Sequence, residues 1–313
     1  LYWSLQFRWL GIFSALTLLF GLRSFLGYVQ FNRVSKENNF SNGLRVMSYN
    51  CMLFDLYNWS DDNNSKSRES IFKMLEKESP DILCLQEYYT SENPKSFANT
   101  QALTERLNAK NYHTAYTTTL RETDHWGVAT FTRYPIIRQG KIEFETKTNN
   151  ICIFSDLVID KDTVRVYNVH LQSIQFRRED YQFVGEVLSD KSNEEIEHSK
   201  NILRRLKRGF LKRADQAEKV AESIKNCPYK VIVCGDFNDT PSSYAYETMR
   251  GQLKDAFVEA GNGFEKTYRG KMPAFRIDYI LHSKEFKTLE YRKIQQGLTD
   301  HFPVTAILEK NKY

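Results

Sequence analysis

Short apolar runs with the character of buried β-strands recur along most of the chain and alternate with stretches of helical periodicity. The strand-like runs cover residues 44–50, 82–85, 126–131, 151–159, 164–170, 231–236, 277–281 and 304–308. Apolar positions at helical spacing mark residues 68–77 and 98–107, and most strongly residues 194–225. This alternation predicts one α/β domain, which we place at residues 44–310.

The first thirty residues have a different pattern, because residues 9–22 (WLGIFSALTLLFGL) carry no charge and are mostly apolar. This run is shorter than the roughly 20 residues that cross a bilayer, but an arginine that reaches the interface at one end would extend it. We expect residues 1–30 to form an apolar membrane-anchor helix, truncated at its N-terminus because the chain starts with Leu1. A buried helix of the domain is the alternative. The flanking charges do not assign a side of the membrane, and the polar residues 31–43 are typical of a linker.

The net charge and the cysteine content limit the possible partners and the cellular compartment only slightly. A net charge of +5 and a pI of about 8.8 are compatible with an anionic partner such as nucleic acid or a phospholipid head group. The five cysteines are odd in number and form no CxxC pair, so we expect buried, reduced thiols. The middle of the segment 194–225 is strongly basic, with Lys200, Arg204, Arg205, Lys207, Arg208, Lys212 and Arg213. It predicts either a solvated helix face or a contact with nucleic-acid phosphates or anionic lipid.

Acidic, amide and imidazole side chains stand at the ends of four segments that are far apart in the sequence. These segments are 82–87 (ILCLQE), 164–170 (VRVYNVH), 231–238 (VIVCGDFN) and 298–301 (LTDH). Such ends can meet only at one edge of a folded sheet. Acids, amides and histidines gathered there are typical of a metal-assisted site that cleaves phosphoesters.

Each of these positions also has a plain structural interpretation. Asp236 and Asn238 stand two residues apart and could present an acid and an amide together, but the same residues are common in turns. Glu87 suits a magnesium ligand or an exposed strand end. Asn50 could support the same metal or cap a loop, and His170 could donate a proton or bind a phosphate.

Asp278 and His301 are informative only together with a partner residue. Asp278 stands in a strand between apolar neighbours and is costly to bury unless it works or pairs with Arg276. His301 follows Asp300, although the same dipeptide recurs at residues 124–125 and is weak evidence alone. The chain has no P-loop, HExxH or GxSxG motif, and its six histidines lack zinc-ligand spacing.

Taken together, the chain resembles the endonuclease/exonuclease/phosphatase superfamily, which has the deoxyribonuclease-I-like fold. The matching pieces occur in the order of that superfamily and are SYN (48–50), LQE (85–87), NVHLQS (168–173), GDFND (235–239), RIDYIL (276–281) and TDHFPV (299–304). The apolar N-terminal segment also makes the chain similar to the membrane-attached bacterial members. The resemblance implies a four-layer α/β sandwich, in which two mixed β-sheets pack together between helices and the site lies at one edge.

The resemblance also implies a role for each motif residue. Glu87 would be the main ligand of Mg²⁺ or Mn²⁺, helped by Asn50 and Asp300. Asp236 would orient or deprotonate the attacking water. Asp278 and Asp300 would orient the catalytic histidine or a metal-bound water. Asn238 and His301 would contact the scissile phosphate and stabilise its charge. His170 would match the proton-donating or phosphate-binding histidine of the nuclease branch of the superfamily.

These implications give an expected function. We expect a membrane-anchored, Mg²⁺-dependent hydrolase of phosphodiester or phosphomonoester bonds, most simply a nuclease-type phosphodiesterase. A lipid phosphoesterase and a non-catalytic binding module on the same fold are the alternatives. The expected substrate is a nucleic acid or a phospholipid, and we expect a monomer with no obligate protein partner. The motifs are shared between the branches of the superfamily, so they do not select the substrate.

Overall fold

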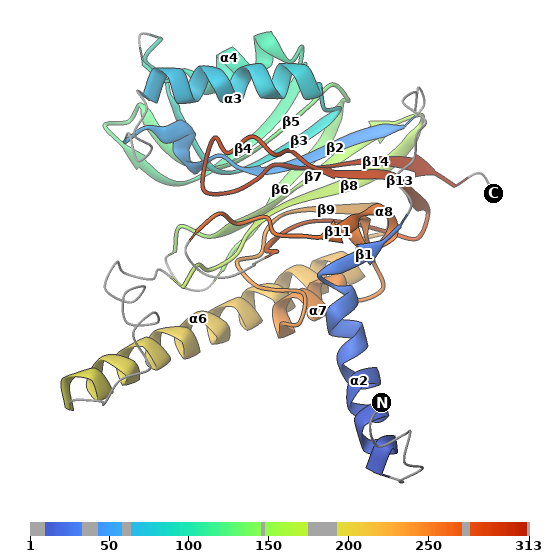
Figure 1. The fold of residues 1–313 in the computed structure, drawn as a ribbon. Helices are drawn as coiled ribbons and strands as arrows, with labels where there is room; N and C mark the ends of the chain where they lie inside the picture. Colours follow the sequence, from blue (N-terminus) through green and yellow to red (C-terminus); the bar gives the residue numbers. More distant parts are fainter. Residues whose placement is uncertain are drawn as a thin grey trace.

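Two six-stranded sheets pack face to face and carry helices on both outer sides (Figure 1). The computed structural model describes residues 10–32, 43–57, 64–94, 96–144, 148–174, 193–270 and 276–311. The first sheet has the strand order β13 (Phe286–Lys293), β14 (Val304–Lys310), β2 (Leu44–Asn50), β3 (Ile82–Ser91), β5 (Asp124–Thr132) and β4 (Asn111–Leu120). The second has the order β10 (Lys254–Asp255), β12 (Asp278–His282), β9 (Lys230–Asp236), β8 (Asp162–His170), β7 (Ile151–Ile159) and β6 (Ile136–Ile142). The predicted α/β arrangement of two mixed sheets between helices is confirmed.

The helices follow the sequence pattern closely. They are α2 (Leu10–Leu26), α3 (Asn64–Glu78), α4 (Asn99–Arg106), α6 (Asn193–Lys225), α7 (Tyr244–Arg250) and α8 (Ala256–Ala260), with a 3₁₀ turn at Met52–Asp55. Helices α3 and α4 cover the first sheet, and α6 and α7 cover the second (Figure 1). A short two-stranded sheet pairs β1 (Val29–Phe31) with β11 (Asn262–Phe264). Residues 29–31, at the end of the expected anchor, are therefore tied to the domain.

Apolar side chains from both sheets form the central core. Val46, Ile82, Val166, Ile232 and Ile280 are almost fully buried between the sheets. Separate apolar clusters fill the space between each sheet and its helices. Because strands alternate their side chains, each sheet can bury one face in the centre and the other under helices. The five cysteines are free thiols and four of them are buried, as expected.

Two parallel strand pairs determine where the polar strand ends gather. Strand β2 runs parallel to β3 in the first sheet, and β8 runs parallel to β9 in the second. The register places His170 opposite Asp236, and Asp278 opposite Asp236 on its other side. Side chains from β8, β9 and β12 therefore meet at one edge of the second sheet.

Three expected strand boundaries differ from the structure. Strand β3 does not end at Glu87 but continues through a bulge to Ser91. Residues 298–300 form bends rather than a strand, and His301 makes only an isolated bridge with Tyr268. Asp278 begins β12 instead of lying inside it. Bulges and bridges depend on long-range pairing, which local apolar patterning does not encode.

Helix α2 projects away from the sandwich on the side of the second sheet (Figure 1). Its apolar side chains are largely exposed, including Phe13, Leu18 and Leu19. The alternative of a buried domain helix is therefore wrong. Within the described part of the chain, no helix combines the length and apolarity needed to cross a membrane. Residues 1–9 of the expected anchor and most of the expected linker lie outside the described residues.

Candidate active site

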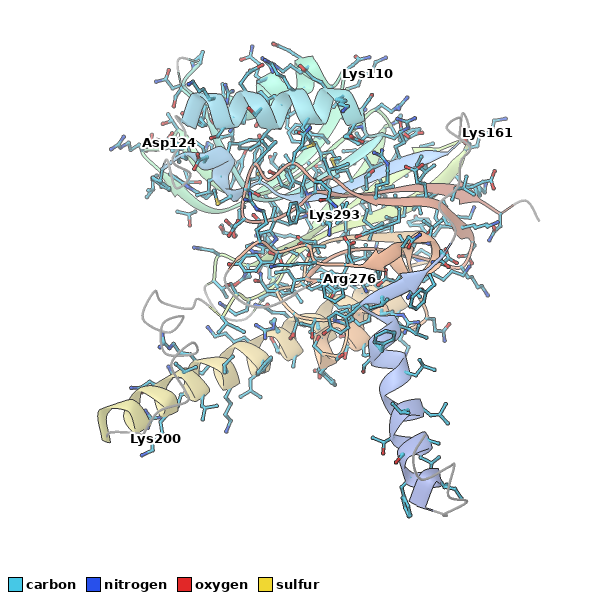
Figure 2. All side chains as sticks on the ribbon, viewed as in Figure 1. Lys110, Asp124, Lys161, Lys200, Arg276 and Lys293 are labelled. Carbon is cyan, nitrogen blue, oxygen red and sulfur yellow. The ribbon has the colours of Figure 1, made fainter. Side chains whose placement is uncertain are left out.

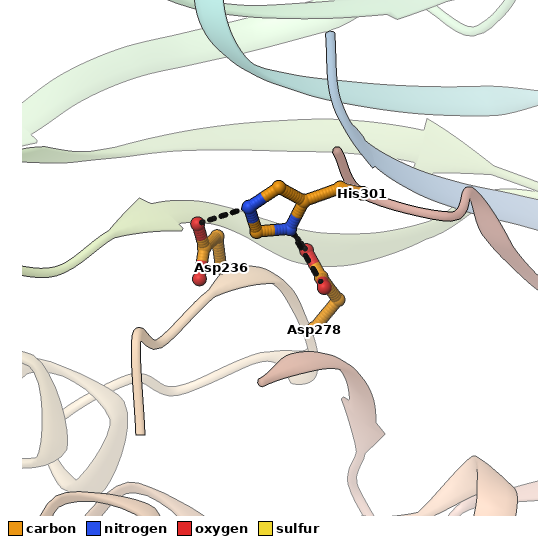
Figure 3. A group of neighbouring side chains, drawn as sticks. All are labelled: Asp236, Asp278 and His301. Carbon is orange, nitrogen blue, oxygen red and sulfur yellow. Dashed lines mark hydrogen bonds and ion pairs between the residues drawn. The ribbon is translucent and has the colours of Figure 1, made fainter. Parts of the chain in front are cut away.

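The centre of the site is a buried chain of two carboxylates and one imidazole (Figure 3). His301 Nδ1 lies 3.0 Å from Asp278 Oδ2, and His301 Nε2 lies 3.7 Å from Asp236 Oδ2. Thr299 holds the loop that carries His301, because its hydroxyl accepts a hydrogen bond from the His301 backbone N–H at 3.1 Å. The expected proximity of Asp236, Asp278 and His301 is thus present in the structure.

The electrostatics of this chain favour a charged imidazole. Burial alone would lower the pKa of His301, but Asp278 and Asp236 outweigh it and hold this pKa well above the usual value. The three groups lie within 4.8 Å of one another, which is close enough to share a metal ion. In the structure, His301 Nδ1 is already engaged in a hydrogen bond with the Asp278 carboxylate. The arrangement therefore suits a hydrogen-bonded chain that orients His301.

His170 lies on the other side of Asp236 and has the opposite electrostatic environment. Its Nε2 lies 3.9 Å from Asp236 Oδ2 and 3.8 Å from Glu87 Oε1. This buried nitrogen has no hydrogen-bond partner among the described residues. Burial lowers the pKa of His170, and Asp236 opposes the change only in part. The site thus places one neutral and one charged histidine around a single carboxylate, a division typical of acid–base sites.

Asp236 itself is held by amide donors. It accepts hydrogen bonds from Asn50 Nδ2 at 3.0 Å and from the Asn238 backbone N–H at 2.8 Å. Burial raises the pKa of Asp236 to about 6, although His301 opposes this shift. A carboxylate whose pKa lies near neutrality is suited to accept a proton.

Asn50 was expected to assist the metal and Asn238 to contact the phosphate, but the amide groups of both residues donate to carboxylates. Asn50 Nδ2 also donates to Glu87 Oε1 at 3.2 Å, while Asn50 Oδ1 accepts from the Met52 N–H at 3.1 Å. Rotation of this amide would offer its oxygen to a metal but would give up the Met52 bond. Asn238, with φ of 51°, donates from Nδ2 to the Leu171 carbonyl at 3.0 Å and to Asp236 at 3.3 Å.

Glu87 reaches the site through the bulge in β3. The register shifts between Leu85 and Tyr88, and Glu87 has φ of 46°, in the left-handed region that is rare for a side chain of this size. Strain of this kind is concentrated at functional sites. Its side chain lines a cleft of about 730 Å³ together with His170, and an adjoining cavity of about 590 Å³ together with Asp300 and Arg269.

The residues around the cleft offer oxygen donors of the kind that a small divalent cation binds. Glu87 and Asp300 line one cavity, and Glu87 and Asp236 both face the His170 nitrogen that has no hydrogen-bond partner among the described residues. Hard oxygen donors are the ligands that Mg²⁺ and Mn²⁺ prefer. Asp300 faces the cavity beside Glu87, whereas its neighbour His301 faces Asp278. Seven of the eight expected residues thus form one connected cluster around Asp236, and Asp300 borders it through Glu87.

Several supporting residues were not identified from the sequence. Arg276 pairs with Asp255 at 2.6 Å in a buried ion pair, so the alternative pairing with Asp278 is wrong. Gln86 Nε2 donates to Asn168 Oδ1 at 2.8 Å and joins the two sheets beneath the site. A signal existed for this pair, because both residues interrupt apolar strand patterns.

Arg213 was expected on the basic face of the long helix but is fully buried. Its Nε donates to Asp239 Oδ2 at 2.8 Å, and its Nη1 donates to the Gln172 carbonyl at 2.9 Å. Arg213 therefore fastens α6 to the segments that follow Asp236 and His170. Its spacing from Gly209, Gln216 and Val220 on the buried face of α6 could have shown this.

Known structures share this fold. A protein of the endonuclease/exonuclease/phosphatase family from Leptotrichia buccalis matches with a TM-score of 0.58 at 16% identity, over 85% of this chain and 99% of the other. The human nocturnin catalytic domain, with a bound sulfate anion, matches with a TM-score of 0.58 at 18% identity, over 86% of this chain and 94% of the other. A mannosyl-6-phosphatase from Bacteroides thetaiotaomicron matches with a TM-score of 0.57 at 18% identity, over 85% of this chain and 99% of the other. These identities support the fold alone.

The sequence itself carries the stronger assignment. No curated protein sequence matches this chain. The profile of the Endonuclease/Exonuclease/phosphatase family, however, matches residues 47–301, which is most of the chain and spans every strand end described above. The chain therefore belongs to the Endonuclease/Exonuclease/phosphatase family, whose members hydrolyse phosphoester bonds.

Proposed function

We propose that this protein is a Mg²⁺- or Mn²⁺-dependent hydrolase of phosphodiester bonds. The observation that supports this most strongly is the position of the buried Asp236 carboxylate, whose Oδ2 lies 3.7 Å from His301 Nε2 and 3.9 Å from His170 Nε2. Glu87 Oε1 lies 3.8 Å from the same His170 Nε2. All of these side chains come from one chain, so the proposal needs no second subunit and we retain the monomer as part of it.

The proposed roles follow from the contacts. Glu87 would hold the metal ion, with Asp300 and a rotated Asn50 as further oxygen ligands. When bound, the ion would neutralise charge on the phosphoryl oxygens. Asp236 would accept a proton from the attacking water, since it is buried and its pKa is raised to about 6.

The histidines would act on the phosphate. His301, held charged and oriented by Asp278, would stabilise negative charge on a phosphoryl oxygen. His170 would contact the substrate from the cleft of about 730 Å³, through its Nε2, which has no hydrogen-bond partner in the part of the chain that the structure describes. Asn238 would reach the phosphate only if its bond to Leu171 or to Asp236 opened. Its proposed role is therefore to position Asp236 as well as to contact substrate.

The substrate class is the least constrained part of the proposal. A nucleic acid is our first candidate, because His170 matches the histidine of the nuclease branch. A phospholipid is the second candidate, because the exposed apolar side chains of α2 support attachment to a lipid surface. A non-catalytic module would not be expected to keep a competent side chain at every motif position.

A substrate panel tests this proposal. The full chain is incubated with plasmid DNA, RNA, phospholipid vesicles, a sugar phosphate and bis(4-nitrophenyl) phosphate, each with Mg²⁺. We expect metal-dependent cleavage of a phosphodiester. Cleavage of the sugar monophosphate alone would replace the phosphodiesterase with a phosphatase. No cleavage of any of them, in a chain shown to bind the metal, would favour the binding module.

A further inference from the structure

The N-terminal half of α6 extends beyond the sheet that its C-terminal half covers (Figure 1). The C-terminal half buries Ala217 and Val220 against the second sheet. In the projecting half, one stripe at helical spacing carries both basic and apolar side chains. We call this stripe the outer face of α6, and it consists of Lys200, Leu203, Arg204, Lys207, Arg208 and Leu211.

This outer face combines positive charge with exposed leucine. Leu203 is 63% exposed and Leu211 is 62% exposed, and Lys207 and Arg208 lie exposed between them. The stripe contains no acidic residue. Figure 2 shows Lys200 on the projecting part of the helix, away from the body of the sandwich.

A nucleic acid would use only half of these features, because its phosphates attract lysine and arginine but give no reason to expose leucine. The surface of an anionic bilayer uses both, since apolar side chains enter the interface while basic ones pair with head groups. Helix α2, with its exposed apolar side chains, projects on the same side of the sandwich (Figure 1). We propose that the outer face of α6 docks on an anionic phospholipid bilayer.

This docking would bring the bilayer close to the active site. Lys212 follows the outer face directly and lines the cleft of about 730 Å³ with Glu87 and His170. Arg213, one residue further, fastens the helix to Asp239. The docking itself does not depend on the proposed function, whereas its consequence, catalysis next to the lipid head groups, does.

The test measures how the full chain partitions between water and vesicles. One set of vesicles is pure phosphatidylcholine and the other also contains phosphatidylserine. We expect tighter binding to the anionic vesicles. The double variant Lys207→Glu with Arg208→Glu should lower the partition coefficient for these vesicles by about 25-fold or more, at about fivefold per basic residue. The matched control reverses two exposed lysines in the opposite layer and should retain wild-type binding. These are Lys77→Glu in α3, which Figure 1 labels, and Lys110→Glu, which Figure 2 labels.

A second variant separates lipid from nucleic acid. Leu203→Ser with Leu211→Ser should weaken vesicle binding and leave the affinity for duplex DNA unchanged. The proposal is overturned if the charge reversal weakens vesicle binding no more than its control does. It is also overturned if only DNA binding responds to the charge reversal. Hydrolysis of soluble bis(4-nitrophenyl) phosphate is measured on the same variants, so a failure of the proposed catalysis is detected independently of a failure to dock.

Discussion

Replacing Asp236 with asparagine is expected to lower phosphodiester hydrolysis by about 10³- to 10⁴-fold, at the upper end of what a positioned general base contributes. The change keeps the size of the side chain but removes its ability to accept a proton. It also replaces one of the two acceptor oxygens with a donor, so either Asn50 Nδ2 or the Asn238 backbone N–H loses its acceptor. In the wild type, the rate should fall as the pH drops below about 6, because the pKa of Asp236 is raised to that value and protonation removes the base. The variant should lose this acidic limb.

A matched control lies at the other end of the neighbouring strand. Asp162 begins β8, eight residues before His170, and pairs with Lys230 at 2.6 Å. Asp162→Asn makes the same chemical change on the same sheet, and its activity should stay close to that of the wild type. Initial rates of both variants with one soluble diester, together with thermal unfolding curves, provide the comparison. Wild-type activity in Asp236→Asn would contradict the assigned site.

Replacing His301 with glutamine is expected to lower the rate by about 10²- to 10³-fold, the usual effect of removing one preorganised donor to a developing negative charge. Asp278→Asn should have a different signature, since Asp278 is a positioning residue that acts through the imidazole. Asp278 raises the pKa of His301, so its loss should lower that pKa. His301 would then lose its proton at a lower pH, and the alkaline limb of the pH–rate profile should move in the acidic direction.

The Asp124-His125 dipeptide, which repeats the Asp-His sequence of residues 300–301, provides the control for the His301 and Asp278 variants. His125 stacks on Tyr116 with the ring centroids 4.4 Å apart, and its Nε2 lies 3.2 Å from Glu92. His125→Gln should therefore retain the wild-type pH–rate profile. An Asp278→Asn variant that loses activity without any shift of the alkaline limb would show that Asp278 acts by some other route.

The sequence was sufficient for the fold and for most of the site. Apolar runs marked the central strands, and parallel pairing brought the polar ends of β8 and β9 together. His170 and Asp236 could therefore be predicted as neighbours, and they are paired in the register. Asn50 at the end of β2 followed the same rule and lies 3.0 Å from Asp236.

What the sequence could not predict depends on contacts between distant segments. The bulge that turns Glu87 into the cleft arises from its pairing with β5, and no local residue marks it. A basic run does not show which arginine has a buried carboxylate partner, so Arg213 was grouped with its exposed neighbours although it pairs with Asp239. His301 follows a run of bends and makes only an isolated bridge instead of ending a strand, and Thr299 accepts a hydrogen bond from its backbone N–H.

Titration of the full chain with Mn²⁺, followed by electron paramagnetic resonance, tests most directly whether separated strand ends share one divalent ion. We expect one saturable site in the wild type. In Glu87→Gln, which keeps the shape of the side chain but loses its charge, the affinity should fall by at least about 10-fold to 100-fold, because losing a ligand should cost no less than losing a residue that orients one. The control His125→Gln should bind as the wild type does. A chain that binds no Mn²⁺, or a Glu87→Gln variant with undiminished affinity, would contradict the account.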